Sequence, residues 1–189
     1  MQAKVLIAMG SPRQGGNSAT LATQVAAGAQ AAGAQVEVIR LHDLDIRPCR
    51  ACDACHRGTE RNCVVEDDMQ ALYPKLRETD GLVIASPVYW FTVSAQTKLF
   101  MDRWYALESP QGNALAGKRI GIVLTYGDSD PFNSGAVNAL RTFQDAFGYV
   151  RAKIVGTVYG SADKPGEIKE NQALMDKAYR LGKQLVSKE

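Results

Sequence analysis

The side chains best suited to redox or metal chemistry are the four cysteines, which all lie between Cys49 and Cys63. Their spacing is C-x2-C-x2-C-x7-C, with Cys52 and Cys55 as the inner pair. Three thiolates at such short intervals can hold one face of an iron–sulfur cubane, while a fourth closes it from the returning chain. Structural zinc prefers two separated C-x2-C pairs, which a shared middle cysteine fits poorly. The spacing leaves two alternatives open: a metal-free thiol set that forms a labile disulfide, and burial of thiols as small hydrophobes.

A second candidate site is the polar stretch from Gly10 to Thr20, between an apolar run and an alanine-rich segment that reads as a helix. A strand, a tight loop and a helix leave unpaired helix N–H groups that favour a phosphate. Gly15 and Gly16 allow close backbone approach, and Arg13 can grip phosphate oxygens in pairs. The side chains of Ser11, Asn17, Ser18 and Thr20 can add donors. The alternative is an ordinary turn with Asn17 or Ser18 as the helix N-cap.

The loop matches neither of the two best-known phosphate-binding patterns. A Walker loop needs Lys followed by Ser or Thr where this chain has Asn17 and Ser18, and G-x-G-x-x-G is absent after Gly10. The pattern Gly10-Ser-Pro-Arg-x-Gly-Gly-Asn-Ser18 instead resembles the phosphate loop of the NAD(P)H-dependent FMN reductases, which have a flavodoxin-like fold.

Alternating apolar and amphipathic segments predict the scaffold that positions these residues. Strands are expected at 4–9, 35–41, 81–86, 119–125 and 153–159, and helices at about 18–32, 68–78, 94–106, 134–148 and 167–187. Gly33 is expected to cap the C-terminus of the first of these helices. This alternation predicts an α/β protein with a flavodoxin-like, doubly wound, five-stranded parallel sheet, of order 2-1-3-4-5, with helices on both faces. Residues 1–189 are expected to form one FMN-binding domain with a cysteine-rich insertion at about 47–66.

Ligands of such sheets bind beyond the carboxyl ends of the strands, which directs attention to two further loops. Three aromatic residues follow the third predicted strand, and Thr125 to Asp128 follow the fourth. Aromatic faces and backbone donors suit a flat conjugated ring, although single rings can equally pack in the core or at a subunit contact. The resemblance implies that Pro87, Val88, Tyr89, Trp90 and Phe91 wrap one edge of the isoalloxazine ring. It implies that Thr125, Tyr126, Gly127 and Asp128 line its other side.

The cysteine stretch extends the resemblance to one branch of the same family. Pro48 precedes the cysteines and Asp67-Asp68-Met69 follow them, as in the iron–sulfur flavoproteins. This implies that Cys49, Cys52, Cys55 and Cys63 hold a [4Fe–4S] cluster, although relatives that keep several of these cysteines without a cluster are known. Nearby polar residues are expected to be structural: Asp67 and Gln70 as a capping box, and Lys98 with Asp102 as a helix-surface pair. Arg103, like Lys98 and Asp102, is expected to lie outside the flavin site.

Composition excludes several classes of partner. The 22 basic and 20 acidic residues give no electrostatic case for nucleic acid or an anionic membrane. No apolar run has the ~20 residues of a membrane helix, and no signal-peptide pattern is present, so a cytoplasmic location is expected.

The resemblance implies an FMN-dependent oxidoreductase that takes reducing equivalents from NAD(P)H, or from ferredoxin, and passes them to a small acceptor such as a quinone. No side chain is predicted to be catalytic, because the cofactor carries the chemistry. The resemblance also implies a homodimer or homotetramer. Three alternatives stay open: an electron carrier without small-molecule turnover, a cysteine-based redox sensor, and a plain phosphate-ligand binding module.

Overall fold

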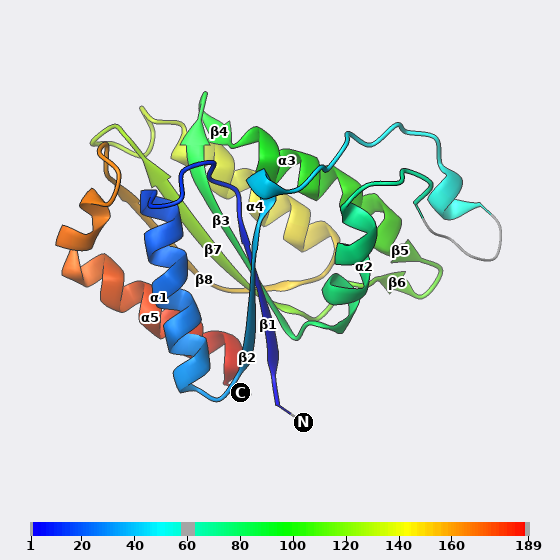
Figure 1. The fold of residues 1–189 in the computed structure, drawn as a ribbon, viewed down its shortest axis with the longest axis horizontal. Helices are drawn as coiled ribbons and strands as arrows, with labels where there is room; N and C mark the ends of the chain where they lie inside the picture. Colours follow the sequence, from blue (N-terminus) through cyan, green and yellow to red (C-terminus); the bar gives the residue numbers. More distant parts are fainter. Residues whose placement is uncertain (1, 58–62, 188–189) are drawn as a thin grey trace.

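The computed structural model describes residues 2–57 and 63–187. Its centre is a parallel sheet in the order β2-β1-β3-β7-β8 (Figure 1). The strands of this path are β1 (Lys4–Met9), β2 (Gln35–Arg40), β3 (Gly81–Tyr89), β7 (Arg119–Tyr126) and β8 (Lys153–Ser161). With β7 and β8 as the fourth and fifth parallel strands, the predicted order 2-1-3-4-5 is confirmed, and the fold is flavodoxin-like.

Helices cover both faces of this sheet. The helices α1 (Asn17–Ala31) and α5 (Gln172–Val186) lie on one face, and α2 (Met69–Glu78), α3 (Ala95–Asp102) and α4 (Ala136–Tyr149) on the other. Alternate residues of β1 enter the two cores: Leu6 and Ala8 pack with α2, α3 and α4, whereas Val5 and Ile7 pack with α1 and α5. Side chains alternate along a strand, so a strand with both faces covered is apolar throughout.

Short elements connect these layers. They are η1 (Leu41–Asp43), η2 (Ala54–His56), η3 (Arg103–Leu107), η4 (Glu167–Glu170), β4 (Thr92–Val93), β5 (Glu108–Ser109) and β6 (Gly112–Asn113). The expected helix at 94–106 is α up to Asp102 and then 3-10, and the expected helix at 167–187 is divided at Asn171, whose side chain accepts a hydrogen bond from Leu174 N.

One predicted loop is a strand. The aromatic stretch after position 86 was expected to be irregular, but β3 continues to Tyr89 and turns back into β4. Pro87 remains paired with Thr125 of β7, and Val88 pairs with Val93 of β4. The aromatic residues therefore sit on a projecting hairpin and not in a loose loop. The hairpin of β5 and β6 was also not predicted.

No helix among the described residues is long and apolar enough to cross a membrane.

Candidate functional site

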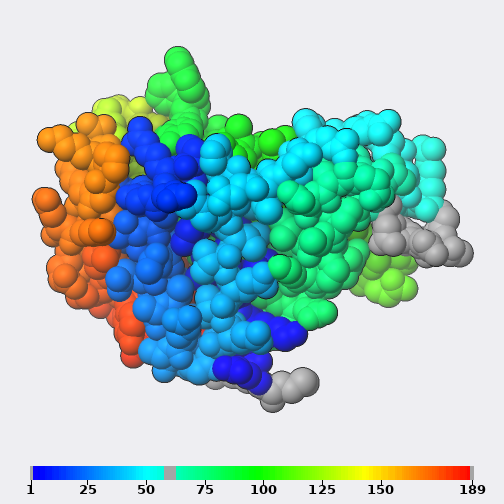
Figure 2. All heavy atoms as spheres, viewed as in Figure 1, coloured from blue at the N-terminus to red at the C-terminus, as the bar shows by residue number. Residues whose placement is uncertain are grey.

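The carboxyl ends of β1, β3, β7 and β8 open on a crevice with a cavity volume of about 220 Å³. It is lined by Ser11, Arg13, Gly16, Asn17, Ser18, Pro87, Val88, Tyr89, Thr125, Tyr126, Gly127, Ala162 and Asp163. Figure 2 shows the segments that follow β1 and β8, in blue and orange, lying against each other, with the β3–β4 hairpin above them in green. The three loops predicted from the sequence thus meet at one edge of the sheet, together with a fourth loop that was not predicted.

The start of α1 forms one end of the crevice. Its N-cap is Gly16, so no side chain caps the helix, and its first backbone bond runs from Thr20 N to Gly16 O at 2.9 Å. The N-terminal amides are therefore free of a side-chain competitor, and the exposed Arg13 lies beside them. A Cβ on Gly16 would lie 3.0 Å from Ser11 Oγ, so the turn is tight. Uncapped amides next to a guanidinium suit a phosphate group.

Asn17 has a structural role that the sequence did not indicate. Its side-chain nitrogen donates to Ala162 O at 3.1 Å and Lys164 O at 2.9 Å, and its side-chain oxygen accepts from Ile168 N at 3.2 Å. The amide is thus occupied in tethering the loop after β8 to α1. This tether explains why Ala162 and Asp163 line the crevice.

Hydroxyl groups connect the phosphate end to the exit of β3. Ser94 Oγ donates to Gly10 O at 2.7 Å, and Ser94 N donates to Ser86 Oγ at 3.0 Å. Gly10 fits closely here, since a Cβ on it would lie 1.9 Å from Thr97 Oγ1. The loop after β1 is therefore fixed against the first turn of α3.

Trp90 and Phe91 form the tip of the β3–β4 hairpin and do not line the crevice. Both have positive φ, 47° and 66°, and their side chains are 92% and 54% exposed. Two-residue hairpin turns with positive φ at both positions normally use Asn-Gly, so two bulky aromatics make this a strained turn. It is held from one side by Asn138 Nδ2, which donates to Phe91 O at 3.2 Å.

The remaining predicted residues divide between the crevice wall and its surroundings. Thr125 and Tyr126 are buried in the wall, and burial raises the pKa of the Tyr126 hydroxyl. Thr20 and Asp128 are outside the lining. The Asp128 carboxylate faces its own loop, where Oδ1 accepts from Asp130 N at 3.3 Å.

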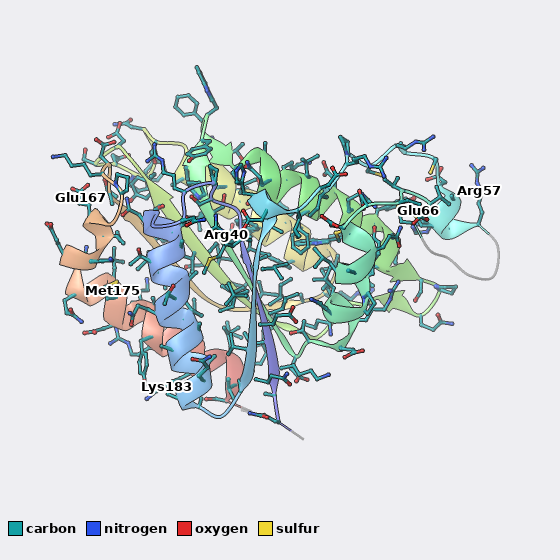
Figure 3. All side chains as sticks on the ribbon, viewed as in Figure 1. Arg40, Arg57, Glu66, Glu167, Met175 and Lys183 are labelled. Atoms are coloured by element: carbon teal, nitrogen blue, oxygen red, sulfur yellow. The ribbon has the colours of Figure 1, made fainter. Side chains whose placement is uncertain are left out.

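The cysteine segment, described over residues 47–57 and 63–67, lies at the opposite end of the molecule from the crevice. In Figure 3, Arg57 and Glu66 mark this segment, and Glu167 marks the loop beside the crevice. Cys49 and Cys52 are exposed, Cys55 is buried and Cys63 is half-buried. Burial raises the pKa of the Cys55 thiol, and the nearby charges of Cys63, Cys49 and Cys52 raise it further.

Thiolates are the donors that iron–sulfur clusters prefer, so the donor set suits such a group. Within residues 2–57 and 63–187, however, no three Cys, His, Asp or Glu side chains are arranged as metal ligands.

One structural prediction near this segment needs correction. Asp67 and Gln70 do not form a capping box, because the Gln70 amide donates to Cys63 O at 2.8 Å and Val65 O at 2.7 Å. Arg103 lies outside the crevice lining, as expected, and it is buried beneath the cysteine segment, where its guanidinium contacts Asp67 and Cys63. The expected surface pair is confirmed, with Lys98 Nζ 2.5 Å from Asp102 Oδ1.

Comparison with known proteins agrees with this geometry. A family model described as NADPH-dependent FMN reductase matches residues 3–166. The chain is 32% identical, over 194 residues, to the iron–sulfur flavoprotein MJ1083 of Methanocaldococcus jannaschii, covering 97% of this chain and 95% of that one. Its fold resembles an NAD(P)H:quinone oxidoreductase from Methanothermobacter marburgensis (TM-score 0.79, 19% identity, 100% and 98% covered). It also resembles an archaeal flavodoxin (TM-score 0.62, 13% identity, 97% and 96% covered).

The flavodoxin-like fold and the family match together define the chain as an oxidoreductase. The chain belongs to the NADPH-dependent FMN reductase family.

Proposed function

We propose that the chain binds FMN in the crevice at the carboxyl edge of its sheet and uses it to oxidise NAD(P)H and reduce a small acceptor such as a quinone. The phosphate would bind the first turn of α1 with Ser11, Arg13, Gly16 and Ser18. The ring would lie between the end of β3, at Pro87 to Tyr89, and the end of β7, at Thr125 to Gly127. The bound FMN would also contact four residues that lie around the crevice, namely Thr20, Trp90, Phe91 and Asp128.

The observation that carries this proposal is the uncapped start of α1 beside an exposed arginine, in a chain of an FMN reductase family. A helix whose first turn lacks a side-chain cap satisfies its orphan N–H groups with water or with an anion. The wall formed by Pro87, Val88 and Tyr126 adds the apolar surface that a flat ring requires.

Bound FMN supplies the hydride and electron chemistry, so the residues of this chain are needed to bind and orient it. Buried Ser11 and Ser18 offer hydroxyls at the phosphate end. A tyrosine hydroxyl is neutral at ordinary pH, and burial raises the pKa of Tyr126 further. The tether from Asn17 to the loop after β8 keeps the crevice in shape before the ligand arrives.

We further propose that Cys49, Cys52, Cys55 and Cys63 hold a [4Fe–4S] cluster. The supporting observations are the compact cysteine spacing and the similarity over nearly the whole chain to a protein named iron–sulfur flavoprotein. A ferredoxin would then be an alternative electron donor. If the four thiols stay metal-free, a cysteine-based redox sensor is the alternative function.

An anaerobic absorbance spectrum with iron and sulfide analysis tests both cofactors at once. We expect one FMN per chain, bleached rapidly by NADH or NADPH, and iron and sulfide in equal amounts. Reduction by ferredoxin, together with indifference to both nicotinamides, would instead indicate an electron carrier. A colourless protein that neither takes up FMN nor quenches its fluorescence would overturn the proposal in favour of a phosphate-ligand binding module.

We also propose a cytoplasmic homodimer or homotetramer. Its support is the set of exposed aromatic side chains outside the crevice, among them Trp90, Phe91 and Tyr105, of which Tyr105 is 48% exposed. Aromatic residues are enriched at subunit contacts. Light scattering after size-exclusion chromatography measures the mass, and a monomer at all concentrations would contradict this assembly.

A further inference from the structure

Arg103 is a cation buried in the interior on the side of the molecule that carries the cysteines. It is the first residue of η3, and its side chain is 1% exposed. Among the described residues it is the largest fully buried side chain by volume. A buried guanidinium is costly unless its charge and its N–H groups are satisfied. Its position therefore requires specific partners.

Those partners come from both arms of the cysteine segment. Arg103 Nη1 donates to Arg47 O at 2.9 Å, just before the first cysteine, and it pairs with the Asp67 carboxylate, just after the last. Arg103 Nη2 donates to Cys63 Sγ at 3.3 Å and to Val65 O at 3.4 Å. The Arg103 guanidinium thus contacts the chain on both sides of the cysteine segment. Without these contacts, the segment would be a long connection between the rest of the structure's elements.

Asp67 completes the connection from the other side. Its carboxylate is fully buried and accepts from Arg47 N at 2.9 Å and from Met69 N at 3.0 Å. Asp67 therefore joins the first arm to the start of α2, while Arg103 joins both arms to η3. This pair links three separate stretches of the chain.

Cys63 is held more firmly than Cys49 and Cys52. Its sulfur accepts from Arg103, and its carbonyl accepts from the Gln70 side chain at 2.8 Å. Cys49 and Cys52, in contrast, are exposed.

We propose that Arg103 and Asp67 form a buried clamp that closes the cysteine segment at both ends and fixes Cys63 in position before any metal binds. Arg103 is a positioning residue, acting through Cys63 and through the backbone of Arg47 and Val65. The clamp itself stands on the contacts described, whereas its consequence for a cluster rests on the proposed function.

Trypsin cleavage of the metal-free protein tests the clamp directly, because Arg50 and Arg57 are exposed cleavage sites on the segment. In Arg103→Gln we expect cleavage at these sites to be at least ~10-fold faster than in the unchanged protein, since cleavage follows the population of the open segment. Arg103→Lys keeps the charge near Asp67 but cannot reach both arms, so its rate should be intermediate. Hydrogen exchange should show lost protection in residues 44–57 and 63–68, with the amides of β1 unchanged.

Arg141→Gln is the matched control, because Arg141 forms an exposed pair with Asp145 at 2.9 Å. It should leave both cleavage and exchange unchanged. If Arg103→Gln loses its circular dichroism signal and so does not fold, the cleavage rates of Arg103→Lys and Asp67→Asn are compared instead. Equal cleavage of the clamp variants and Arg141→Gln would overturn the clamp.

Iron and sulfide content after anaerobic reconstitution separates the clamp from the cluster proposal. We expect Arg103→Gln to retain FMN affinity and to bind less than half of the iron of the unchanged protein, with partial recovery in Arg103→Lys. Should the unchanged protein take up no iron, the cluster proposal fails, and the cleavage result still decides the clamp. Full iron uptake by Arg103→Gln would contradict the assignment of Arg103 as a positioning residue for Cys63.

Discussion

The crevice and the cysteine segment lie at opposite ends of the molecule and are built in different ways (Figure 3). The crevice takes its shape from the sheet, because the carboxyl ends of four neighbouring parallel strands must meet at one edge. The described residues of the cysteine segment contain no strand of that sheet, and η2 is their one helical turn. It depends on a buried ion pair, Arg103 with Asp67, that joins its two ends. One region is fixed by topology and the other by two side chains.

The largest expected effect is the loss of the buried pair. Asp67→Ala would leave the Arg103 guanidinium buried without its counter-charge, so we expect the free energy of unfolding to fall by about 3–5 kcal/mol. Denaturant titration of the apo-protein measures this. Asp145→Ala removes an exposed pair and should cost less than ~1 kcal/mol. Similar losses of stability in the two variants would show that the buried pair contributes no more than an exposed one, and the cysteine segment would then not depend on it.

The crevice should instead respond through ligand affinity. Arg13 is exposed beside the start of α1, so Arg13→Gln should leave stability unchanged and weaken FMN binding by about tenfold. Fluorescence titration measures the dissociation constant. Riboflavin lacks the phosphate and should bind the variant and the unchanged protein equally well. A parallel loss for both ligands would argue against phosphate binding at Arg13.

Two glycines in the same loop sharpen the distinction between packing and ligand contact. A methyl group on Gly10 would collide with Thr97 Oγ1, whereas one on Gly15 meets nothing within 4 Å. We expect Gly10→Ala to cost about 1–3 kcal/mol of stability and Gly15→Ala to change it by less than ~0.5 kcal/mol. Thermal unfolding without ligand measures both. Equal melting temperatures would show that the loop is not fixed against α3.

The smallest effect concerns the loop after β8. The Glu167 carboxylate accepts from the N–H groups of Lys164 and Asp163, both at 2.8 Å, and these bonds lower its pKa from 4.5. A lowered pKa in the folded state means that its contribution is complete above about pH 4.5 and is lost as the pH falls through the folded value. Denaturant titration at several pH values measures the free energy of unfolding. In Glu167→Gln this free energy should fall less on acidification than in the unchanged protein, and an identical pH profile would contradict this role.

Sequence patterns were sufficient for the features that follow from local periodicity. The order of the parallel strands was confirmed, and so was Gly33 as the C-terminal stop of α1. Gly33 has φ 87°, its N–H donates to Gln30 O, and Ala34 N donates to Ala29 O, as in a Schellman motif. The roles of the individual crevice residues toward FMN stay predictions.

What the sequence did not indicate depends on contacts between distant residues. Asp163 reaches the crevice because Asn17 binds a loop far along the chain, and no local pattern reports that bond. Arg103 looks like an ordinary helix-end cation until its burial is known. The β3–β4 hairpin was missed because Trp90 and Phe91 occupy a turn whose usual signal is Asn-Gly.

The chain's two tryptophans are at positions 90 and 104, and they occupy opposite environments. Trp90, at the hairpin tip beyond the crevice, is almost wholly in water, whereas Trp104 is 5% exposed in the core adjoining Arg103. Their emission should differ in wavelength, red-shifted for Trp90 and blue-shifted for Trp104. Intrinsic fluorescence thus offers separate optical reporters for events at the crevice end and at the cysteine end of the same molecule.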